Sequence, residues 1–251
     1  MTPDQLVPSP HRLLAGLRDL LLPVRCAGCR REAMGSLCGD CAAALASAGP
    51  RQVRPDPAPP GLPPCHAAGR YGGRFRELIL SYKDRGRYGL ARPLADVLAM
   101  AVVAAVPTPH AVLLAPVPTA PRAVRERRGD HMLWLARATL DRLRRDGRTA
   151  AVVRPVRAVS RPDSAGLSAA ERHRMARASL RPRRGRGTRR PLAIGASLEG
   201  PSALVVLDDV ITTGATIAAM SGVLAGMNLR VDAAVVLAAT ERRWRPRAHR
   251  V

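Results

Sequence analysis

Two adjacent carboxylates lie in the most informative stretch of the sequence. It reads Leu204-Val-Val-Leu-Asp208-Asp209-Val-Ile-Thr212-Thr213-Gly214-Ala215-Thr216, a pattern of buried strand, glycine-containing turn and helix start. Backbone N–H groups at a helix start and nearby threonine hydroxyls bind phosphate, and glycine allows a close approach of the backbone. The carboxylates would repel a phosphate but can accept hydrogen bonds from sugar hydroxyls. The stretch therefore predicts a ribose 5-phosphate site, with Asp208 and Asp209 at the ribose and residues Thr212, Thr213, Gly214, Ala215 and Thr216 at the phosphate.

Other phosphate-binding motifs do not fit this stretch. It lacks the Gly-Lys-Ser/Thr ending of a Walker A loop, and no Gly-x-Gly-x-x-Gly follows a predicted strand. Taken alone, an Asp-Asp pair is also compatible with a solvated strand end. The Thr-Thr-Gly-Ala-Thr continuation favours the ligand site.

Four of the five cysteines form two Cys-x-x-Cys pairs, Cys26 with Cys29 and Cys38 with Cys41. Two such pairs can place four thiolates around one tetrahedral Zn²⁺, and Gly28 and Gly39 are suited to the tight turns. The spacer between the pairs is shorter than in most zinc ribbons. Disulfides are the competing interpretation, and an intracellular chain favours the metal. Cys65 stands alone and is predicted to be a small buried residue.

The basic residues divide into one lysine and 40 arginines. Because arginine is used almost everywhere else, Lys83 is a candidate for a position that needs a compact ammonium group. Arg122, Arg125 and Arg128 follow a predicted strand, in a loop where a pyrophosphate group could be held. Solvated surface charge is the alternative for these three arginines.

The net charge of +22 suggests nucleic acid or another phosphorylated ligand. The near-absence of lysine also fits a GC-rich genome, which explains part of the excess without any ligand. Two arginine-rich segments, 181–190 and 242–250, have the composition of flexible regions that bind single-stranded nucleic acid without sequence preference. A disordered insertion and tail are equally compatible with that composition.

The chain is predicted to be cytoplasmic. It has no stretch of about 18 apolar residues free of charge or proline, and its start lacks the pattern of a signal peptide.

Periodicity predicts an α/β protein with a parallel sheet flanked by helices and a small N-terminal zinc-knuckle module. Seven prolines and two glycines occur in residues 49–64, which are therefore predicted to form a linker. The expected domains are a helix and zinc knuckle over 1–48, an α/β domain over 65–240 and a basic tail over 241–251. The predicted helices span 10–22, 42–48, 74–82, 90–105, 130–145, 168–177 and 214–227, and the predicted strands span 111–115, 151–153, 203–207 and 231–238.

Residues 204–216 resemble the phosphoribosyl pyrophosphate (PRPP) motif of type I phosphoribosyltransferases, and the chain as a whole resembles the ComF family. The resemblance runs from about Leu20 to Thr240. It rests also on the four cysteines and on three further segments, which are 71–83, 116–118 with 127–129, and 166–172. It implies a phosphoribosyltransferase-like domain with an N-terminal zinc knuckle, PRPP with Mg²⁺ as ligand, and a link to natural competence and DNA uptake.

Four amide-bearing positions of the family pattern are changed in this chain. Arg128-Gly129-Asp130-His131-Met132 replaces Arg-Gly-Phe-Asn-Gln, and Ser164 and Met175 replace a glutamine and an asparagine. The expected reaction is displacement of pyrophosphate from PRPP through an oxocarbenium-like state, but these changes make binding a firmer expectation than turnover. The alternative is a non-catalytic competence factor that keeps the fold and binds single-stranded DNA, or the competence helicase and recombination proteins.

Overall fold

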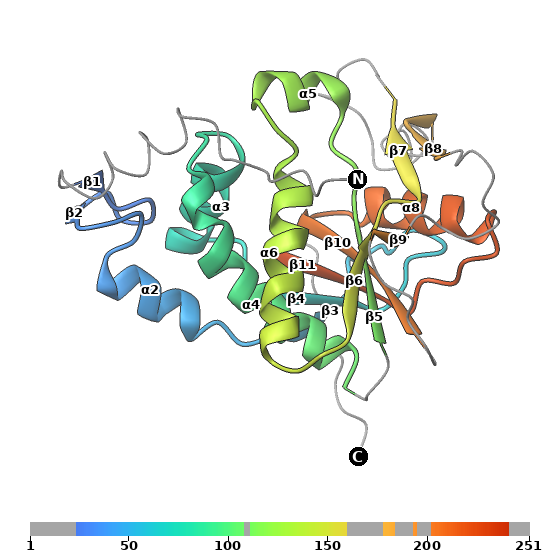
Figure 1. Cartoon of the computed structure of the whole chain (residues 1–251), viewed down its shortest axis with the longest axis horizontal. Helices are drawn as coiled ribbons and strands as arrows, with labels where there is room; N and C mark the ends of the chain where they lie inside the picture. The colour runs from blue at the N-terminus through green and yellow to red at the C-terminus, as the bar shows by residue number, and fades with distance from the viewer. Residues whose placement is uncertain (1–23, 108–110, 160–177, 184–192, 195–201, 241–251) are drawn as a thin grey trace, which may run out of the picture.

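The computed structural model describes residues 24–107, 111–159, 178–183, 193–194 and 202–240 (Figure 1). The predicted helices over 10–22 and 168–177, the tail from 241 and residues 184–190 of the first arginine-rich segment lie outside these ranges.

A seven-stranded sheet forms the centre of the molecule, with the strand order β3-β4-β11-β10-β5-β6-β9. The five inner strands are parallel, and the short edge strands β3 and β9 pair antiparallel to their neighbours. The predicted α/β class with a mostly parallel sheet is confirmed. The strands are β3 (Arg51–Val53), β4 (Cys65–Arg70), β5 (Ala111–Pro116), β6 (Ala150–Val153), β9 (Ala193–Ile194), β10 (Ser202–Ile211) and β11 (Ala233–Ala239).

Helices cover both faces of the sheet, as the continuous apolar runs of its inner strands require. On one face α4 packs against β4 and β11, and α6 against β5, β6 and β10. On the other face α8 packs against β10 and against a separate two-stranded ribbon, β7 with β8. Figure 1 shows these two layers on either side of the sheet. The elements are α3 (Gly73–Lys83), η1 (Tyr88–Leu90), α4 (Ala91–Ala105), α5 (Pro121–Glu126), α6 (His131–Arg145), α8 (Ala215–Ala225), β7 (Val156–Ala158) and β8 (Leu180–Pro182).

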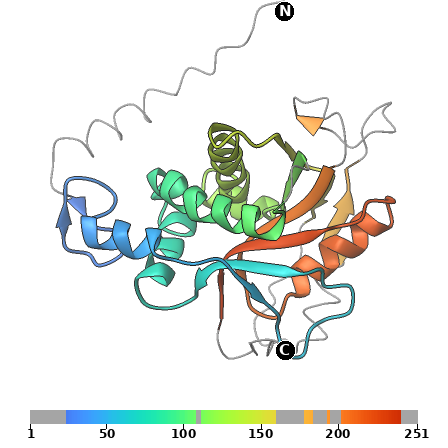
Figure 2. The same ribbon diagram turned by 90° about the horizontal axis from the view of Figure 1, so that it is seen from below.

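The N-terminal cysteine module packs against α3 and α4 at one end of the molecule (Figure 2). It consists of β1 (Val24–Arg25), β2 (Glu32–Ala33) and α2 (Gly39–Ala46). Ala27 and Leu45 are buried in the same apolar cluster as Leu78 of α3. The Ser81 hydroxyl donates a hydrogen bond to the Ala27 carbonyl at 3.1 Å. The module therefore shares a core with the α/β layer.

Part of the proline-rich stretch 49–64 belongs to the sheet. Residues 51–53 form β3, which pairs antiparallel with β4, and Val53 is buried. A three-residue strand at a sheet edge accommodates neighbouring prolines, because only one side of it needs ladder hydrogen bonds. The expected linker thus contains an edge strand.

The segment Tyr88–Ala105 is long and apolar enough to span a membrane by length and composition. In this structure it contains α4, whose buried side chains, among them Leu94, Leu98 and Val102, pack in the core. The apolar side chains of α4 face α6 beside it and β4 and β11 beneath it, and 44% of the segment is buried.

Candidate functional site

The acidic pair extends past the end of the neighbouring strand. Pro116, the last residue of β5, pairs with Leu207 of β10, and the Val117 N–H donates to the Leu207 carbonyl at 2.8 Å. After Val117 the segment that follows β5 turns away from β10. Asp208 and Asp209 therefore lie beyond the last position of β10 that pairs with β5. Ligands of parallel sheets bind beyond the carboxyl ends of strands. The structure puts the predicted carboxylates in that position.

Asp209 points toward the α3 and α6 face and is buried, with 11% of its side chain exposed. Its Oδ2 lies 2.5 Å from Lys83 Nζ and 3.5 Å from His131 Nε2. Burial opposes ionisation of Asp209, but the adjacent His131 and the charge of Lys83 outweigh it and hold its pKa well below the usual range. Burial likewise opposes the charge of Lys83, but Asp209 raises the Lys83 pKa above its ordinary value. The two side chains form an ion pair at the base of the site.

Asp208 has the opposite electrostatic environment. Side chains alternate along a strand, so Asp208 faces away from the Lys83 side. Burial, followed by repulsion from the Asp209 charge, raises the pKa of Asp208 to about 7. Two neighbouring carboxylates therefore differ in proton affinity, which is common where a protein binds or transfers protons.

A cavity of about 220 Å³ opens above the acidic pair. One wall is the loop after β5 with α5 and the start of α6, and the other is formed by the β7–β8 ribbon. Lys83, Asp208, Asp209 and Thr216 all line it. The structure thus brings the two carboxylates, the single lysine and one threonine of the predicted phosphate turn to one cavity.

The remaining residues of the predicted phosphate turn hold its shape. Gly214 has φ +73°, a conformation that favours glycine, and it precedes the first residue of α8. Thr213 is buried, and its Oγ1 accepts a hydrogen bond from the Ala215 N–H at 3.4 Å. Thr212 is exposed. Leu62 of the proline-rich stretch lies against Gly214, where an added Cβ would come within 2.9 Å of its Cδ1.

A polar network that the sequence analysis did not identify surrounds His131. Thr119 Oγ1 donates to Asp130 Oδ1 at 2.8 Å and lies 3.4 Å from His131 Nδ1. Asp130 also caps α6 by accepting from the Leu133 N–H, and it accepts a hydrogen bond from Arg154 at 3.1 Å. His131 is buried at 4% exposure and connects this network to Asp209. The only signal in the sequence was the departure from the family pattern at positions 130–132.

The arginines proposed for pyrophosphate lie on or next to α5 and are exposed. Arg122 pairs with Glu126 four residues later, and neither Arg125 nor Arg128 lines the cavity. Arg127 lines it instead and pairs with Asp84 at 2.9 Å. The structure therefore does not bring Arg122, Arg125 and Arg128 to the acidic pair.

The four paired cysteines converge in the N-terminal module. The Sγ atoms of Cys26, Cys29, Cys38 and Cys41 lie within 4.8 Å of one another, so this cluster could hold a metal ion. Tetrahedral Zn–S bonds of about 2.3 Å put sulfurs roughly 3.8 Å apart, which is compatible with this spacing. Cys65 is buried far along the chain in β4 and has no part in the cluster, as predicted.

The surroundings of the sulfurs fit a bound cation. The Cys38 N–H points at Cys26 Sγ at 3.3 Å. Burial raises the pKa of Cys26, but hydrogen bonds from the backbone of Cys29, Cys38 and Gly28 lower it to about 6. An added Cβ at Gly28 would lie 2.9 Å from Cys41 Sγ, so the backbone approaches the cluster closely.

The two glycines of the knuckles have different roles from those expected. Gly28 serves close packing and does not adopt a positive φ, while Gly39 begins α2 with open space around it. The left-handed turn residue is Arg30, at φ +63°.

No family model and no curated protein matches the chain.

Proposed function

We propose that the protein binds PRPP or another ribose 5-phosphate, and that its α/β layer is a type I phosphoribosyltransferase domain of the ComF kind. The arrangement that carries the proposal is the acidic pair near the carboxyl end of β10, with the Thr-Thr-Gly-Ala-Thr turn into α8 beginning three residues after Asp209. In this proposal Asp208 and Asp209 accept hydrogen bonds from the ribose hydroxyls. The turn and the N-terminus of α8 hold the 5-phosphate.

The proposed reaction is displacement of pyrophosphate at C1 of the ribose, and it requires little covalent chemistry from the protein. Mg²⁺ bound with the pyrophosphate would neutralise the negative charge of the leaving group. The chain's own cations at the cavity are Lys83 and Arg127, and each is held in an ion pair. Their contribution is fixed placement of positive charge close to the reacting carbon, which stabilises developing charge without reorganisation.

Calorimetry with PRPP and Mg²⁺ tests the proposal. The native protein should bind PRPP, and Asp208→Asn/Asp209→Asn should lower the affinity at least tenfold because the ribose hydroxyls lose their acceptors. Asp96→Asn/Asp141→Asn is the matched control, since it removes the same charge from α4 and α6 outside the cavity. Absence of PRPP binding, or equal affinity for both double variants, would refute the proposal.

A second candidate function is a non-catalytic competence factor that binds single-stranded DNA. His131 favours it, because an imidazole stands beside Asp209 where the family pattern has an amide, so that amide is not there to take part in transfer. Fluorescence anisotropy with a labelled oligonucleotide tests this candidate. Affinity should fall steeply with salt and drop when the arginines of 181–190 are replaced by glutamine. Unchanged affinity after that replacement would count against it.

A further inference from the structure

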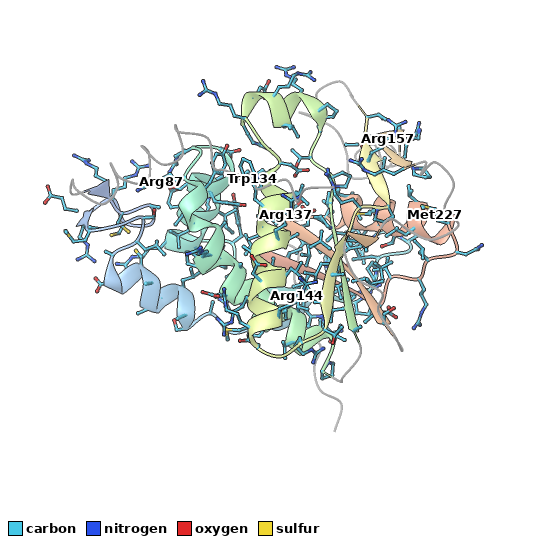
Figure 3. The ribbon with its side chains drawn as sticks, in the orientation of Figure 1. Arg87, Trp134, Arg137, Arg144, Arg157 and Met227 are labelled. Atoms are coloured by element: carbon cyan, nitrogen blue, oxygen red, sulfur yellow. The ribbon has the colours of Figure 1, made fainter. Side chains whose placement is uncertain are left out.

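A second hollow lies between the start of α4 and α6, apart from the cavity above the acidic pair. Its volume is about 440 Å³, within the range of roughly 300–1,000 Å³ that small-molecule sites occupy. The two hollows share no lining residue. Tyr88 of η1 and Arg92 of α4 line one side, and Trp134 and Arg137 of α6, both labelled in Figure 3, line the other. We call this hollow the α4–α6 groove.

Two aromatic rings form a fixed part of the α4–α6 groove. Aromatic residues are scarce in this chain, yet one of its two tryptophans and one of its three tyrosines line the groove. The rings of Tyr88 and Trp134 pack edge to face with their centroids 4.5 Å apart. The Tyr88 hydroxyl donates to the Arg127 carbonyl, and an added Cβ at Gly129 would come within 1.9 Å of the Trp134 ring. Because these contacts hold both rings in place, a planar ligand can pack against them at little cost in ordering.

The charged side chains of the α4–α6 groove are not paired with one another. Arg92 and Arg137 are exposed, and their side chains form no ion pair or hydrogen bond within the described parts of the chain. Asp141 also lines the groove but pairs with neither arginine. Arg142 of the same helix, by contrast, is paired with Asp96. The two guanidinium groups, together with the N-terminus of α4, therefore favour an anion in the groove.

We propose that the α4–α6 groove binds a mononucleotide. The base packs against Trp134 and Tyr88, and Arg92 and Arg137 hold the phosphate. A planar ring and a phosphate in one small molecule match both features of the groove, whereas an uncharged ring leaves the guanidinium groups without a ligand and a bare anion leaves the rings without one. The site is separate from the proposed ribose 5-phosphate site and does not depend on it.

Quenching of Trp134 fluorescence tests the proposal on the full chain. Trp244→Phe replaces the other tryptophan, which lies outside the described residues, so that Trp134 alone reports. AMP, GMP, CMP and UMP are titrated, and at least one should quench the emission because its base packs against the indole ring. In this background Arg92→Gln/Arg137→Gln should weaken the binding of that nucleotide roughly tenfold or more, since the phosphate loses charge-assisted hydrogen bonds.

The matched control is Arg74→Gln/Arg145→Gln, which removes two exposed arginines that do not line the groove. It should change the affinity less than about threefold, because charges at a distance are screened by salt. The matching nucleoside, which lacks the phosphate, should bind roughly tenfold more weakly than the nucleotide. Both double variants should melt within about 3 °C of the Trp244→Phe protein, so that lost binding cannot be attributed to unfolding.

Three results would overturn the proposal: no quench by any of the four mononucleotides, equal loss in both double variants, or binding of a single-stranded oligonucleotide without binding of a mononucleotide. Asp208→Asn/Asp209→Asn in the same background should keep the quench, because the acidic pair lines the other cavity. Loss of the quench in that variant would assign the nucleotide to the acidic pair and refute the groove. A retained quench, with no PRPP binding by the native protein, would refute only the proposed function.

Discussion

Lys83, the last residue of α3, and Asp209, on β10, form an ion pair with 2.5 Å between Nζ and Oδ2. The pair ties a helix of the outer layer to the strand that carries the acidic pair. The same helix is bonded to the cysteine module through Ser81 and the Ala27 carbonyl. One helix thus contacts both chemically distinctive parts of the protein.

Replacing Lys83 with methionine should destabilise the protein by about 3 kcal/mol, because it leaves the Asp209 carboxylate without its cation. Lys83 keeps 30% of its side chain exposed, which puts the loss at the lower end for buried pairs. The double variant Lys83→Met/Asp209→Asn should recover part of the loss, since no unpaired charge remains. Urea denaturation measures both. Arg85→Gln, an exposed position just beyond α3, is the control.

As the pH rises from about 4 to about 7, the free energy of unfolding should fall because of Asp208. Its pKa is raised to about 7 on folding, so the folded state binds more protons than the unfolded state in that interval. The pKa of Asp209 is lowered on folding, so Asp209 adds stability as the pH rises. That added stability no longer changes above about pH 4. Asp208→Asn should therefore gain on the order of 2 kcal/mol over the native protein between pH 5 and pH 8. Asp141→Asn keeps Asp208 and should retain the native fall in stability with rising pH, whereas a curve for Asp208→Asn that runs parallel to the native one would contradict the assignment.

Gly28→Ala should weaken metal binding at the cysteine cluster at least tenfold. The added methyl group would lie 2.9 Å from Cys41 Sγ and 3.3 Å from Leu78 Cδ2, so a ligand and a core side chain must both move. Gly39→Ala is the control, because nothing lies within 4 Å of its Cβ position. Competition with a coloured zinc chelator measures the affinity. Equal affinities of the two variants would show that Gly28 is not close-packed against the site.

Removal of the metal should lower the melting temperature of the whole described domain in one transition. Ala27 and Leu45 belong to the same apolar cluster as α3 and α4, so the module cannot unfold without exposing that core. Scanning calorimetry with and without chelator measures the effect, and metal analysis gives the stoichiometry. Cys65→Ala should keep the native metal content. Unfolding by a reductant, with no effect of the chelator, would favour disulfides over a metal.

Gly214→Ala should destabilise the phosphate turn by roughly 1–2 kcal/mol and reduce ribose 5-phosphate affinity. Its φ of +73° is unfavourable for alanine, and the methyl group would contact Leu62. Gly222 lies within α8 with open space around its Cβ position, so Gly222→Ala should stabilise the helix by up to about 1 kcal/mol. Thermal unfolding and calorimetry on the two variants distinguish the effect of a change in the turn from the effect of a change in the helix.

Much of the secondary structure was predictable because it depends on local patterns. The expected helices at 74–82, 90–105 and 130–145 match α3, α4 and α6 closely, and the expected strands match β5, β6 and β11. β10 runs four residues beyond the predicted end at 207. The acidic pair interrupts the apolar pattern there, but pairing with β11 continues the strand through it.

The sequence by itself determined the acidic pair and its turn, the four cysteines and the alternation of strands and helices. These features are contiguous or closely spaced, and their chemistry follows from residue type and spacing. Only the tertiary structure decided that Lys83 pairs with Asp209, that His131 stands beside that carboxylate, and that Arg127 rather than Arg122, Arg125 or Arg128 reaches the cavity. Each of these contacts depends on strand register or on helix rotation between distant segments. The local pattern of a single segment encodes neither the register nor the rotation.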